Sequence, residues 1–365
     1  MRITYLIGNG FDIGLGLKTS YKSFIEWYCQ QPSQGDEEKW LKEQMKDKPD
    51  QWSDAELAFG ALEFGDGGGD SFDAYVKCYN AFTSAFHRYL KMENERFAVA
   101  SDSQKGLATQ FLRRILNIDA FMTGECSAVF QKRLENIPLS IQFITFNYTD
   151  TIEKILDVSN GTEHEFEFER RPGQAIKVSV ADVLHAHGTL RDSYVFGVDD
   201  PSQIADEKVR EACKRRGGML KGVSVETLGI QDRKNAMKAL RKSELLVTYG
   251  LSFGETDHSW WTTVYEIFRN HGVPIVVCPY APNALTEGRS VRSRTAFYDQ
   301  EKKRLFATLI KRTPTLLPEI ESIKVPRITV LAPAMVDEGH GNSYKCDYFG
   351  LHGIGEKCIG KGSVV

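Results

Sequence analysis

The sequence contains no apolar run close to the roughly 20 residues that a membrane-spanning helix needs. Its first apolar run, residues 3–7, is too short for a signal peptide, and no cleavage site follows it. The sequence has seven cysteines, which is an odd number, and no two of them form a C-x-x-C pair. Both facts argue against a disulfide framework, and the missing C-x-x-C pair also argues against a zinc ribbon. These absences predict a cytoplasmic protein with no membrane partner and no bound metal.

The sequence also lacks a strong excess of charge. Lys and Arg number 46, Asp and Glu number 49, and the formal net charge is −3. This balance argues against a nucleic-acid coat and against a polybasic membrane surface. Residues 207–242 are locally rich in Lys and Arg, but acidic residues are interspersed, so we interpret them as a solvated helix–loop–helix. A nucleic-acid contact through this segment is the alternative, and we do not expect nucleic acid as the main partner.

A length of 365 residues suggests two domains, or one domain with a large insertion. Short apolar runs typical of buried strands occur at residues 3–7, 141–146, 176–184, 244–249 and 274–278. Helical patterns occur at residues 21–28, 151–156, 258–271 and 297–310. The alternation of strand and helix predicts an α/β, Rossmann-like fold with a mostly parallel sheet.

The strand-like runs are interrupted by a long segment of another character. Residues 31–137 are rich in helix formers and aromatics, and we interpret them as a helical insertion. The Rossmann-like core would then be discontinuous, formed by residues 1–30 and 138–320. The glycine-rich residues 321–365 predict an irregular tail.

Because ligands of such folds bind beyond the carboxyl ends of the strands, the residues after each strand are the candidates for a site. Gly8, Asn9 and Gly10 follow the first strand, and Asp12 comes shortly after. Two glycines let the backbone approach a phosphate closely, and a following helix favours its negative charge. The third glycine of the dinucleotide fingerprint is replaced by Ile13, so a tight strand-to-helix turn is an equal alternative.

Asn147 and a pair of histidines follow two further strands. An amide both donates and accepts, so Asn147 can orient a water or a ribose hydroxyl, although a turn or helix-cap role is the simpler alternative. His185 and His187 are two positions apart and would share one face of a strand. Histidine suits general-base chemistry near neutral pH. A metal pair and a buried structural pair are the alternatives for these two residues.

Gly250, Ser252 and Asp257 follow the fourth strand. A glycine and a serine at this place can accept a ribose or a phosphate closely, and a simple βα turn is the alternative. Residues 250–254 also match the G-x-S-x-G pattern of serine hydrolases. The acid and histidine of such an enzyme would have to be Asp257 and His271, which lie in the very next helix and turn and so fit that class poorly.

Taken in chain order, these segments resemble the bacterial AbiH family, which is associated with abortive phage infection. The resemblance spans roughly residues 1–310, and its opening segment is the most specific part. The matching segments are Leu6-Ile7-Gly8-Asn9-Gly10-Phe11-Asp12, Gly16-Leu17-x-Thr19-Ser20-Tyr21, Thr145-Phe146-Asn147-Tyr148-Thr149, His185-Ala186-His187-Gly188 and Gly250-Leu251-Ser252.

The same order also resembles the sirtuin-like fold, which has a glycine loop, then Thr-x-Asn, His-Gly and Gly-x-Ser. This resemblance implies NAD as the substrate and assigns the site residues by role. Asn147 and His187 would be catalytic. Gly8 and Gly10 would line the diphosphate, and Gly250 and Ser252 would line a ribose. As a further hypothesis about the mechanism, we expect Asn9 at the diphosphate, Asp12 and Asp257 as acceptors for ribose hydroxyls, and His185 orienting His187.

Two departures from the sirtuin pattern narrow the implied activity. The glycine loop reads Gly-Asn-Gly-Phe-Asp where sirtuins have Gly-Ala-Gly-x-Ser, and the zinc ribbon of the protein deacylases is missing. The resemblance therefore implies an anti-phage NADase that hydrolyses the nicotinamide–ribose bond. The alternative is a nucleotide sensor that recruits a partner, either a second copy or another defence protein, without breaking the nucleotide.

Overall fold

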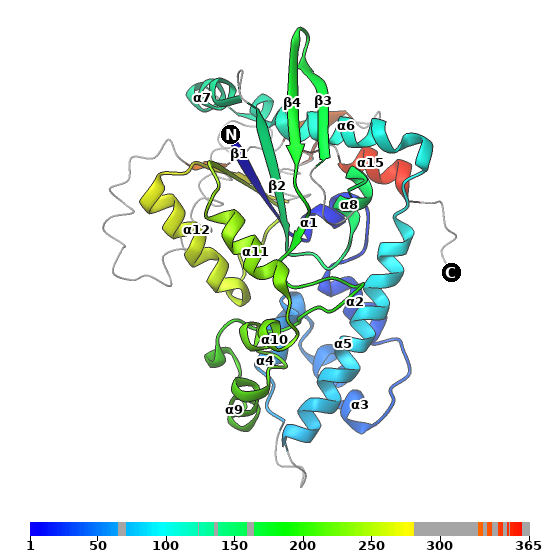
Figure 1. The fold of residues 1–365 in the computed structure, drawn as a ribbon. Coiled ribbons are helices and arrows are strands. Elements are labelled where there is room, and N and C mark those ends of the chain that lie inside the picture. Colours follow the sequence, from blue (N-terminus) through cyan, green and yellow to red (C-terminus); the bar gives the residue numbers. More distant parts are fainter. Residues whose placement is uncertain are drawn as a thin grey trace.

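The computed structural model describes residues 1–64, 71–122, 124–134, 138–158, 164–280, 328–330, 334–337, 342–345, 349 and 351–359. Its centre is a mixed, mostly parallel sheet with the strand order β3-β4-β2-β1-β6-β7-β8, and the short β5 also pairs with β2 (Figure 1). These strands are β1 Arg2–Ile7, β2 Leu139–Thr145, β3 His164–Arg171, β4 Gln174–Val180, β5 Leu184–His185, β6 Leu245–Tyr249, β7 Ile275–Cys278 and β8 Ile328–Val330. The predicted α/β class is confirmed.

The register of the central strands brings their carboxyl ends to one edge of the sheet. β1 is parallel to both β2 and β6, and Ile7 lies opposite Thr145 on one side and Tyr249 on the other. β5 is also parallel to β2, with His185 opposite Thr145. The residues that follow these four strands therefore start from neighbouring points, as the sequence predicted.

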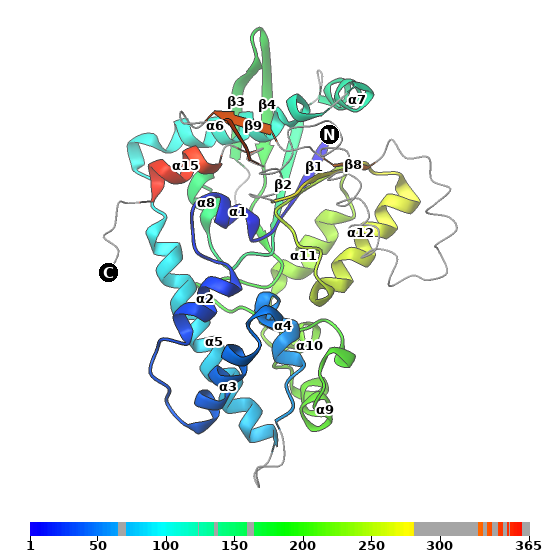
Figure 2. The ribbon, with the colours of Figure 1, turned by 180° about the vertical axis from the view of Figure 1, so that it is seen from behind.

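Helices cover both faces of the sheet, as the two opposite views show (Figures 1 and 2). One face packs against α11 Gln231–Leu240 and α12 His258–His271. The other face packs against α1 Gly10–Gly14, α6 Gln104–Leu116, α7 Gly124–Leu134, α8 Thr151–Leu156 and α15 Leu351–Cys358. Both faces of the strands are thus buried, which explains why the strands appear in the sequence as continuous apolar runs.

A second group of helices lies beyond the carboxyl ends of the strands, in the lower half of Figure 1. We call this group the cap: α2 Tyr21–Tyr28, α3 Asp36–Asp47, α4 Ala55–Gly60, α5 Ser71–Arg96, α9 Glu207–Arg216 and α10 Lys221–Thr227. Its members share a core of aromatic side chains around Phe24, Phe82 and Phe196. The cap therefore joins most of the predicted insertion to a segment much later in the chain.

The remaining helices of the predicted insertion belong to the sheet. In α6 and α7, Phe111, Leu112, Phe130 and Leu134 are buried in the cluster formed with the strands. Single turns of 3-10 helix connect several elements: η1 Pro49–Ser53, η2 Ser101–Ser103, η3 Ile118–Phe121, η4 Pro201–Gln203 and η5 Glu255–Asp257. Residues 31–137 thus contribute to two separate cores.

Several predicted elements have the bounds that the sequence indicated, and others differ. The helices expected at residues 21–28, 151–156 and 258–271 are α2, α8 and α12. The strand expected at 176–184 is divided into β4 and β5, and β4 forms an antiparallel hairpin with β3, which the sequence reading missed. The helix expected at 297–310 lies outside the described residues.

The tail expected to be irregular contains regular structure where it is described. β8 pairs in parallel with β7, and β9 Ala334–Asp337 pairs with β10 Asn342–Lys345. Helix α15 packs on α1, and its Leu351 and Ile354 are buried in the main core. A Cβ on Gly355 would lie 1.9 Å from the carbonyl oxygen of Leu15, so this glycine permits close helix packing.

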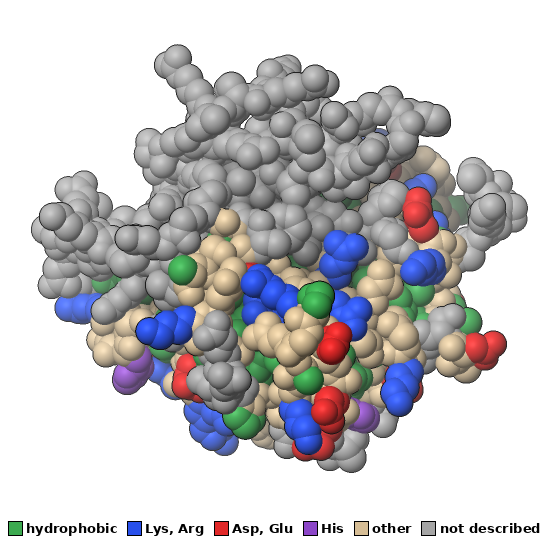
Figure 3. Space-filling view, turned by 90° about the horizontal axis from the view of Figure 1, so that it is seen from above, with side chains coloured by type: hydrophobic (Ala, Val, Ile, Leu, Met, Phe, Trp, Pro, Cys, Tyr) green, Lys and Arg blue, Asp and Glu red, His purple; other side chains and the backbone are tan. Residues whose placement is uncertain are grey.

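The described surface carries charges of both signs. Seen from above, its described part shows basic and acidic side chains side by side (Figure 3). In the Lys- and Arg-rich segment 207–242, Lys214 pairs with Glu211 and Arg241 pairs with Glu266. No helix in the described ranges is both long and apolar enough to span a bilayer.

Candidate functional site

A cavity of about 650 Å³ lies between the carboxyl ends of the strands and the cap. Its volume is within the range of small-molecule binding sites. The sheet core supplies most of the predicted site residues, and the cap supplies the opposite wall. The lining includes Gly8, Asn9, Asp12, Asn147, His187, Gly250, Ser252 and Asp257 from the sheet side, and Tyr21, Asp54, Glu56, Phe86 and Lys221 from the cap side. Gly10 and His185, also predicted as site residues, are not among the lining residues.

The glycines of the predicted phosphate loop pack against a second turn of the backbone. The amide of Gly10 donates to the carbonyl of Gly250, and a Cβ on Gly10 would lie 2.6 Å from the Gly250 Cα. A Cβ on Gly8 would lie 2.6 Å from the Gly250 carbonyl oxygen, and Gly250 itself has a φ of +61°. Close backbone contact therefore accounts for these three glycines, and Gly8 and Gly250 still reach the cavity.

The side chain of Asn9 is fixed at the cavity wall by Thr19. Its Nδ2 donates to the Thr19 carbonyl at 2.9 Å, and its Oδ1 accepts from the Thr19 hydroxyl at 2.5 Å. Thr19 directly precedes Ser20, which caps the first cap helix by accepting from the Ser23 amide. Asn9 thus joins the β1–α1 turn to the start of the cap.

Asp12 places a buried carboxyl group beside Asn147. Its Oδ2 accepts from Thr149 at 2.6 Å and its Oδ1 accepts from Thr151 at 2.7 Å. Burial raises the pKa of Asp12 to about 6, although the hydrogen bonds from Thr149, Thr151 and Asn147 oppose this shift. The group can therefore exchange a proton close to neutral pH.

Asn147 is held from three directions. Its Nδ2 donates to the carbonyl of Gly8 at 3.2 Å and also stabilises the Asp12 carboxylate. Its backbone carbonyl accepts from His185 Nδ1 at 3.0 Å. Asn147 lines the cavity, so its side-chain amide can contact a ligand there.

His185 is a buried ring that supports the Asn147 loop. Its Nε2 lies 2.7 Å from Glu153 Oε1 on α8. Burial acts to lower the pKa of His185, but the Glu153 carboxylate and the bond to Asn147 outweigh it and the pKa is raised. His185 and His187 face different carboxylates, and the described residues contain no group of three side chains suited to a metal ion.

His187 is buried at the cavity wall, beside Asp257. Its Nε2 lies 2.8 Å from Asp257 Oδ1, within ion-pair distance, but neither Nε2 nor Nδ1 has a hydrogen-bond partner of acceptable geometry among the described residues. Burial and the positive charges of Lys221 and Arg233 lower the pKa of His187, although Asp257 opposes them. The ring is therefore neutral at pH 7 and can accept a proton.

Asp257 is bound to a residue that the sequence reading did not select. Its Oδ1 accepts from Lys221 Nζ at 2.8 Å, and the same ammonium donates to Glu56 Oε2 at 2.8 Å. Burial acts to raise the pKa of Asp257, but Lys221 and His187 hold it well below the usual value. Lys221 lies in a run of basic residues and Glu56 in the helical insertion, so nothing in the sequence links them to the strand ends.

The described lining of the cavity is acidic. It contains five carboxyl side chains and one lysine: Asp12, Asp54, Glu56, Glu255, Asp257 and Lys221. Lys221 is already paired with two of these carboxyl groups. An aromatic platform lies nearby, where Phe146 stacks on Trp261 with ring centroids 5.6 Å apart. Ser252 is exposed on the same wall. The arrangement favours a ligand with a cationic or electron-poor ring.

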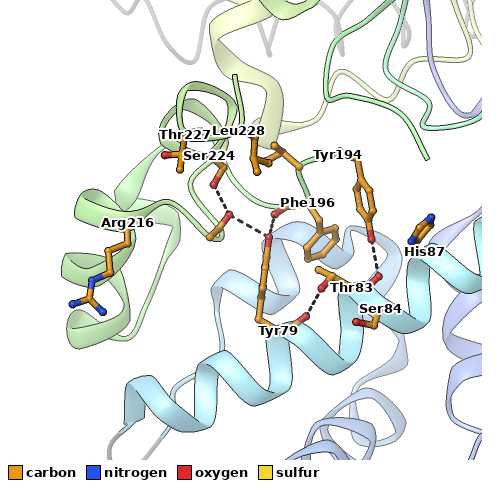
Figure 4. Close-up of a pocket in the computed structure, with 12 residues that line it drawn as sticks. Tyr79, Thr83, Ser84, His87, Tyr194, Phe196, Arg216, Ser224, Thr227 and Leu228 are labelled. Atoms are coloured by element: carbon orange, nitrogen blue, oxygen red, sulfur yellow. Dashed lines mark hydrogen bonds between the residues drawn. The ribbon is translucent and has the colours of Figure 1, made fainter. Parts of the chain in front are cut away.

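A second, more open cavity of about 380 Å³ lies within the cap, between α5 and α10 (Figure 4). Its hydroxyl groups bind backbone carbonyls of the protein itself. Tyr79 donates to Phe196 and Gly218, and Tyr194 donates to Thr83. Because these groups are already satisfied, we place the chemistry in the first cavity, which His187 and Asn147 line.

The comparison with protein families identifies the family to which the chain belongs. A family model described as "Bacteriophage abortive infection AbiH" matches residues 4–278. The match begins in β1 and ends at the last residue of β7, so it includes the whole described cavity. None of the curated proteins matches the chain. The family match covers well over half of the sequence, and the chain belongs to the AbiH family of phage abortive infection proteins.

Proposed function

We propose that this AbiH protein is a defence effector that acts in the cytoplasm and hydrolyses the nicotinamide–ribose bond of NAD. The observation that carries the proposal is the single cavity at the strand ends. It combines an imidazole whose Nδ1 has no partner among the described residues, the side-chain amide of Asn147 and an excess of carboxyl groups. The order of these residues along the chain also resembles the sirtuin-like fold, and that likeness remains a prediction.

The proposed reaction uses water and no redox step. The bond between the ribose C1′ and the nicotinamide nitrogen breaks, and both electrons go to the ring nitrogen, which becomes neutral. The oxygen of a water attacks C1′, and His187 Nδ1 takes the proton that this water releases. The products are nicotinamide, ADP-ribose and a proton, which the imidazole returns to solvent.

The charge of the cavity suits this chemistry. Cleavage passes through an oxocarbenium-like transition state, in which positive charge develops on the ribose. Carboxylates fixed in a buried site stabilise such a charge without having to reorient. Asp12 and Asp257 are fixed in this way, by Thr149 and Thr151 in one case and by Lys221 in the other.

The test is NAD consumption by the purified full chain, followed as release of nicotinamide and ADP-ribose. We expect His187→Ala and Asn147→Ala to lower the rate by about 10²- to 10⁴-fold. His271→Ala removes an exposed histidine at the end of α12 and serves as the matched control. Rates for His187→Ala and Asn147→Ala that equal the His271→Ala rate would contradict the assignment.

The same preparation distinguishes hydrolysis from sensing. A sensor would show a rise in melting temperature with NAD, by the stabilisation RT ln(1 + [L]/Kd), while the NAD stays intact. A toxin directed at nucleic acid would instead bind RNA or DNA with an affinity that falls steeply with salt. Either result, without nicotinamide release in phage-infected cells, would exclude the NADase.

A further inference from the structure

Lys221 is a fully buried ammonium group at the junction of the cap and the sheet core. Its three N–H groups bind Glu56 Oε2 at 2.8 Å, the Thr256 carbonyl at 3.0 Å and Asp257 Oδ1 at 2.8 Å. An ammonium has three donors and no acceptor, so these bonds use all of its capacity. Lys221 therefore contacts no ligand through a further hydrogen bond, and its effect on the site passes through its three partners.

The partners of Lys221 come from separate parts of the chain. Glu56 belongs to cap helix α4, Lys221 begins cap helix α10, and Thr256 and Asp257 lie in η5 after strand β6. Glu56 is fixed on its other side as well, because the amide of Gly197 donates to its Oε1. The group thus connects the cap to the tip of the sheet directly behind the histidine.

Asp257 Oδ1 is shared between Lys221 and His187. Both nitrogens lie 2.8 Å from this one oxygen. A carboxylate this close to Nε2 favours, through its negative charge, the imidazole tautomer with the proton on Nε2. Nδ1 then carries the lone pair, and among the described residues it has neither a hydrogen bond nor the ion-pair contact that Nε2 makes with Asp257.

We propose that Lys221 and Glu56 are positioning residues of the reaction, which hold Asp257 against His187 and leave Nδ1 as the basic atom. The inference rests on the proposed function for its reaction, but the geometry behind it does not depend on the substrate. The histidine would then work only when the cap and the sheet core are joined.

The charged side chains around His187 determine how its pKa depends on Lys221, Glu56 and Asp257. His187 faces Asp257 from η5, Lys221 from α10 and Arg233 from α11. Glu56 and Asp54 from the α4 region surround Lys221 and Asp257. Burial raises the pKa of Glu56 to about 7, and Asp257 adds to the shift while Lys221 opposes it. Glu56 can therefore exchange a proton near neutral pH, close to His187.

The experiment is a pH titration of the histidine side chains by NMR, on full-length protein labelled with ¹⁵N-histidine. A His187→Gln variant assigns the signal among the eight histidines. In the wild type we expect the Nε2–H tautomer and a pKa below the ordinary value. Lys221→Met removes a positive charge next to the ring, and we expect the pKa of His187 to rise by about one unit or more.

Glu56→Gln provides the second variant, in case Lys221→Met does not fold. Its amide can still accept from Lys221 but carries no negative charge, so we expect the pKa of His187 to be lower than in the wild type. Glu255→Gln is the matched control, because it removes a carboxyl from the same cavity that none of the three Lys221 bonds reaches. It should leave the His187 titration as in the wild type.

The outcomes separate this proposal from the proposed function. If His187 titrates identically in the wild type, Lys221→Met and Glu56→Gln, the positioning role is wrong, whatever the NADase assay shows. If the titration shifts as expected but no variant or wild type consumes NAD, the group positions the histidine for another reaction. When both hold, Glu56→Gln should lower kcat and alter the pH profile, with little change in KM.

Discussion

At the scale of single residues, Asp12 gives the account a test that needs no substrate. Burial raises its pKa to about 6, whereas the ordinary value is 3.8. The folded protein binds this proton more tightly than the unfolded chain does. The stability provided by the neutral carboxyl is therefore present at low pH and is lost as the pH rises through about 6.

We expect Asp12→Asn to remove this dependence. The free energy of unfolding of the variant, relative to the wild type, should rise by about 2 kcal/mol between pH 4 and pH 7, since one pKa unit corresponds to about 1.4 kcal/mol. Urea unfolding of both proteins across this range measures the difference. A difference that does not change with pH would show that the folded Asp12 titrates normally.

The glycine turn leads to a second residue-scale prediction. A Cβ on Gly10 would lie 2.4 Å from the Tyr280 Cβ and 2.6 Å from the Gly250 Cα, so Gly10→Ala forces backbone to move. We expect it to lower the free energy of unfolding by about 1–3 kcal/mol.

Gly106 in α6 is the control for this substitution, because a Cβ there meets nothing within 4 Å. Gly106→Ala should leave stability unchanged or raise it by up to about 1 kcal/mol. Thermal unfolding of the two variants compares them directly. Equal effects would mean that the contact between the two turns is looser than the structure shows.

The sequence indicated most of the site, for a specific physical reason. Gly8, Asn147, His187 and Asp257 each follow a strand, and parallel strands bring such positions together at one edge. His185 also lies at this edge, but its contacts with Asn147 and Glu153 hold it behind the cavity wall, where it supports the Asn147 loop. Glu56 and Lys221 could not be found in this way, because they reach the cavity through the packing of the cap.

At the scale of elements, helix α15 tests whether the end of the chain belongs to the fold. Leu351 is fully buried in the main core, against Gly14 of α1. Leu351→Ala should therefore cost about 2–5 kcal/mol of unfolding free energy. Lys357→Ala, on the exposed side of the same helix, should stay within about 0.5 kcal/mol. Similar small effects for both would show that α15 does not dock as described.

Elements with a strong local pattern were predicted well from the sequence. α2 has Ser20 as a cap and apolar residues at helical spacing, and it spans the residues 21–28 where the sequence predicts a helical pattern. β3 was missed because Glu165, Glu167 and Glu169 alternate along an edge strand that is half-exposed. The packing of α15 was missed because its glycines indicate a flexible tail in sequence, whereas Gly355 provides close contact in the structure.

At the scale of the whole molecule, the cavity lies between two separately packed units. The sheet core supplies the histidine and the amide, and the cap supplies Glu56 and Lys221. The three segments 21–60, 71–96 and 207–227 meet in the cap although they are far apart in sequence. Such a division could not be derived from composition, because the boundary between the two units depends on tertiary packing.

This division predicts that ligand binding stabilises the molecule as a whole. In the proposed function a nucleotide in the cavity would contact both units, so NAD at 100 times its Kd should add about 2.7 kcal/mol to the free energy of unfolding. His187→Ala should retain most of this effect, since the imidazole acts on the proton of the water. Calorimetry of wild type and variant with NAD measures it, and stabilisation of neither would show that the folded protein does not bind NAD.

The most direct test of the central claim is the NAD content of phage-infected bacteria that carry this protein, measured by mass spectrometry. We expect NAD to fall after infection of cells with the wild-type protein and nicotinamide and ADP-ribose to rise in equal amounts, whereas cells with His187→Ala keep their NAD. Cells that are protected from phage by the wild-type protein while their NAD stays constant would contradict the account.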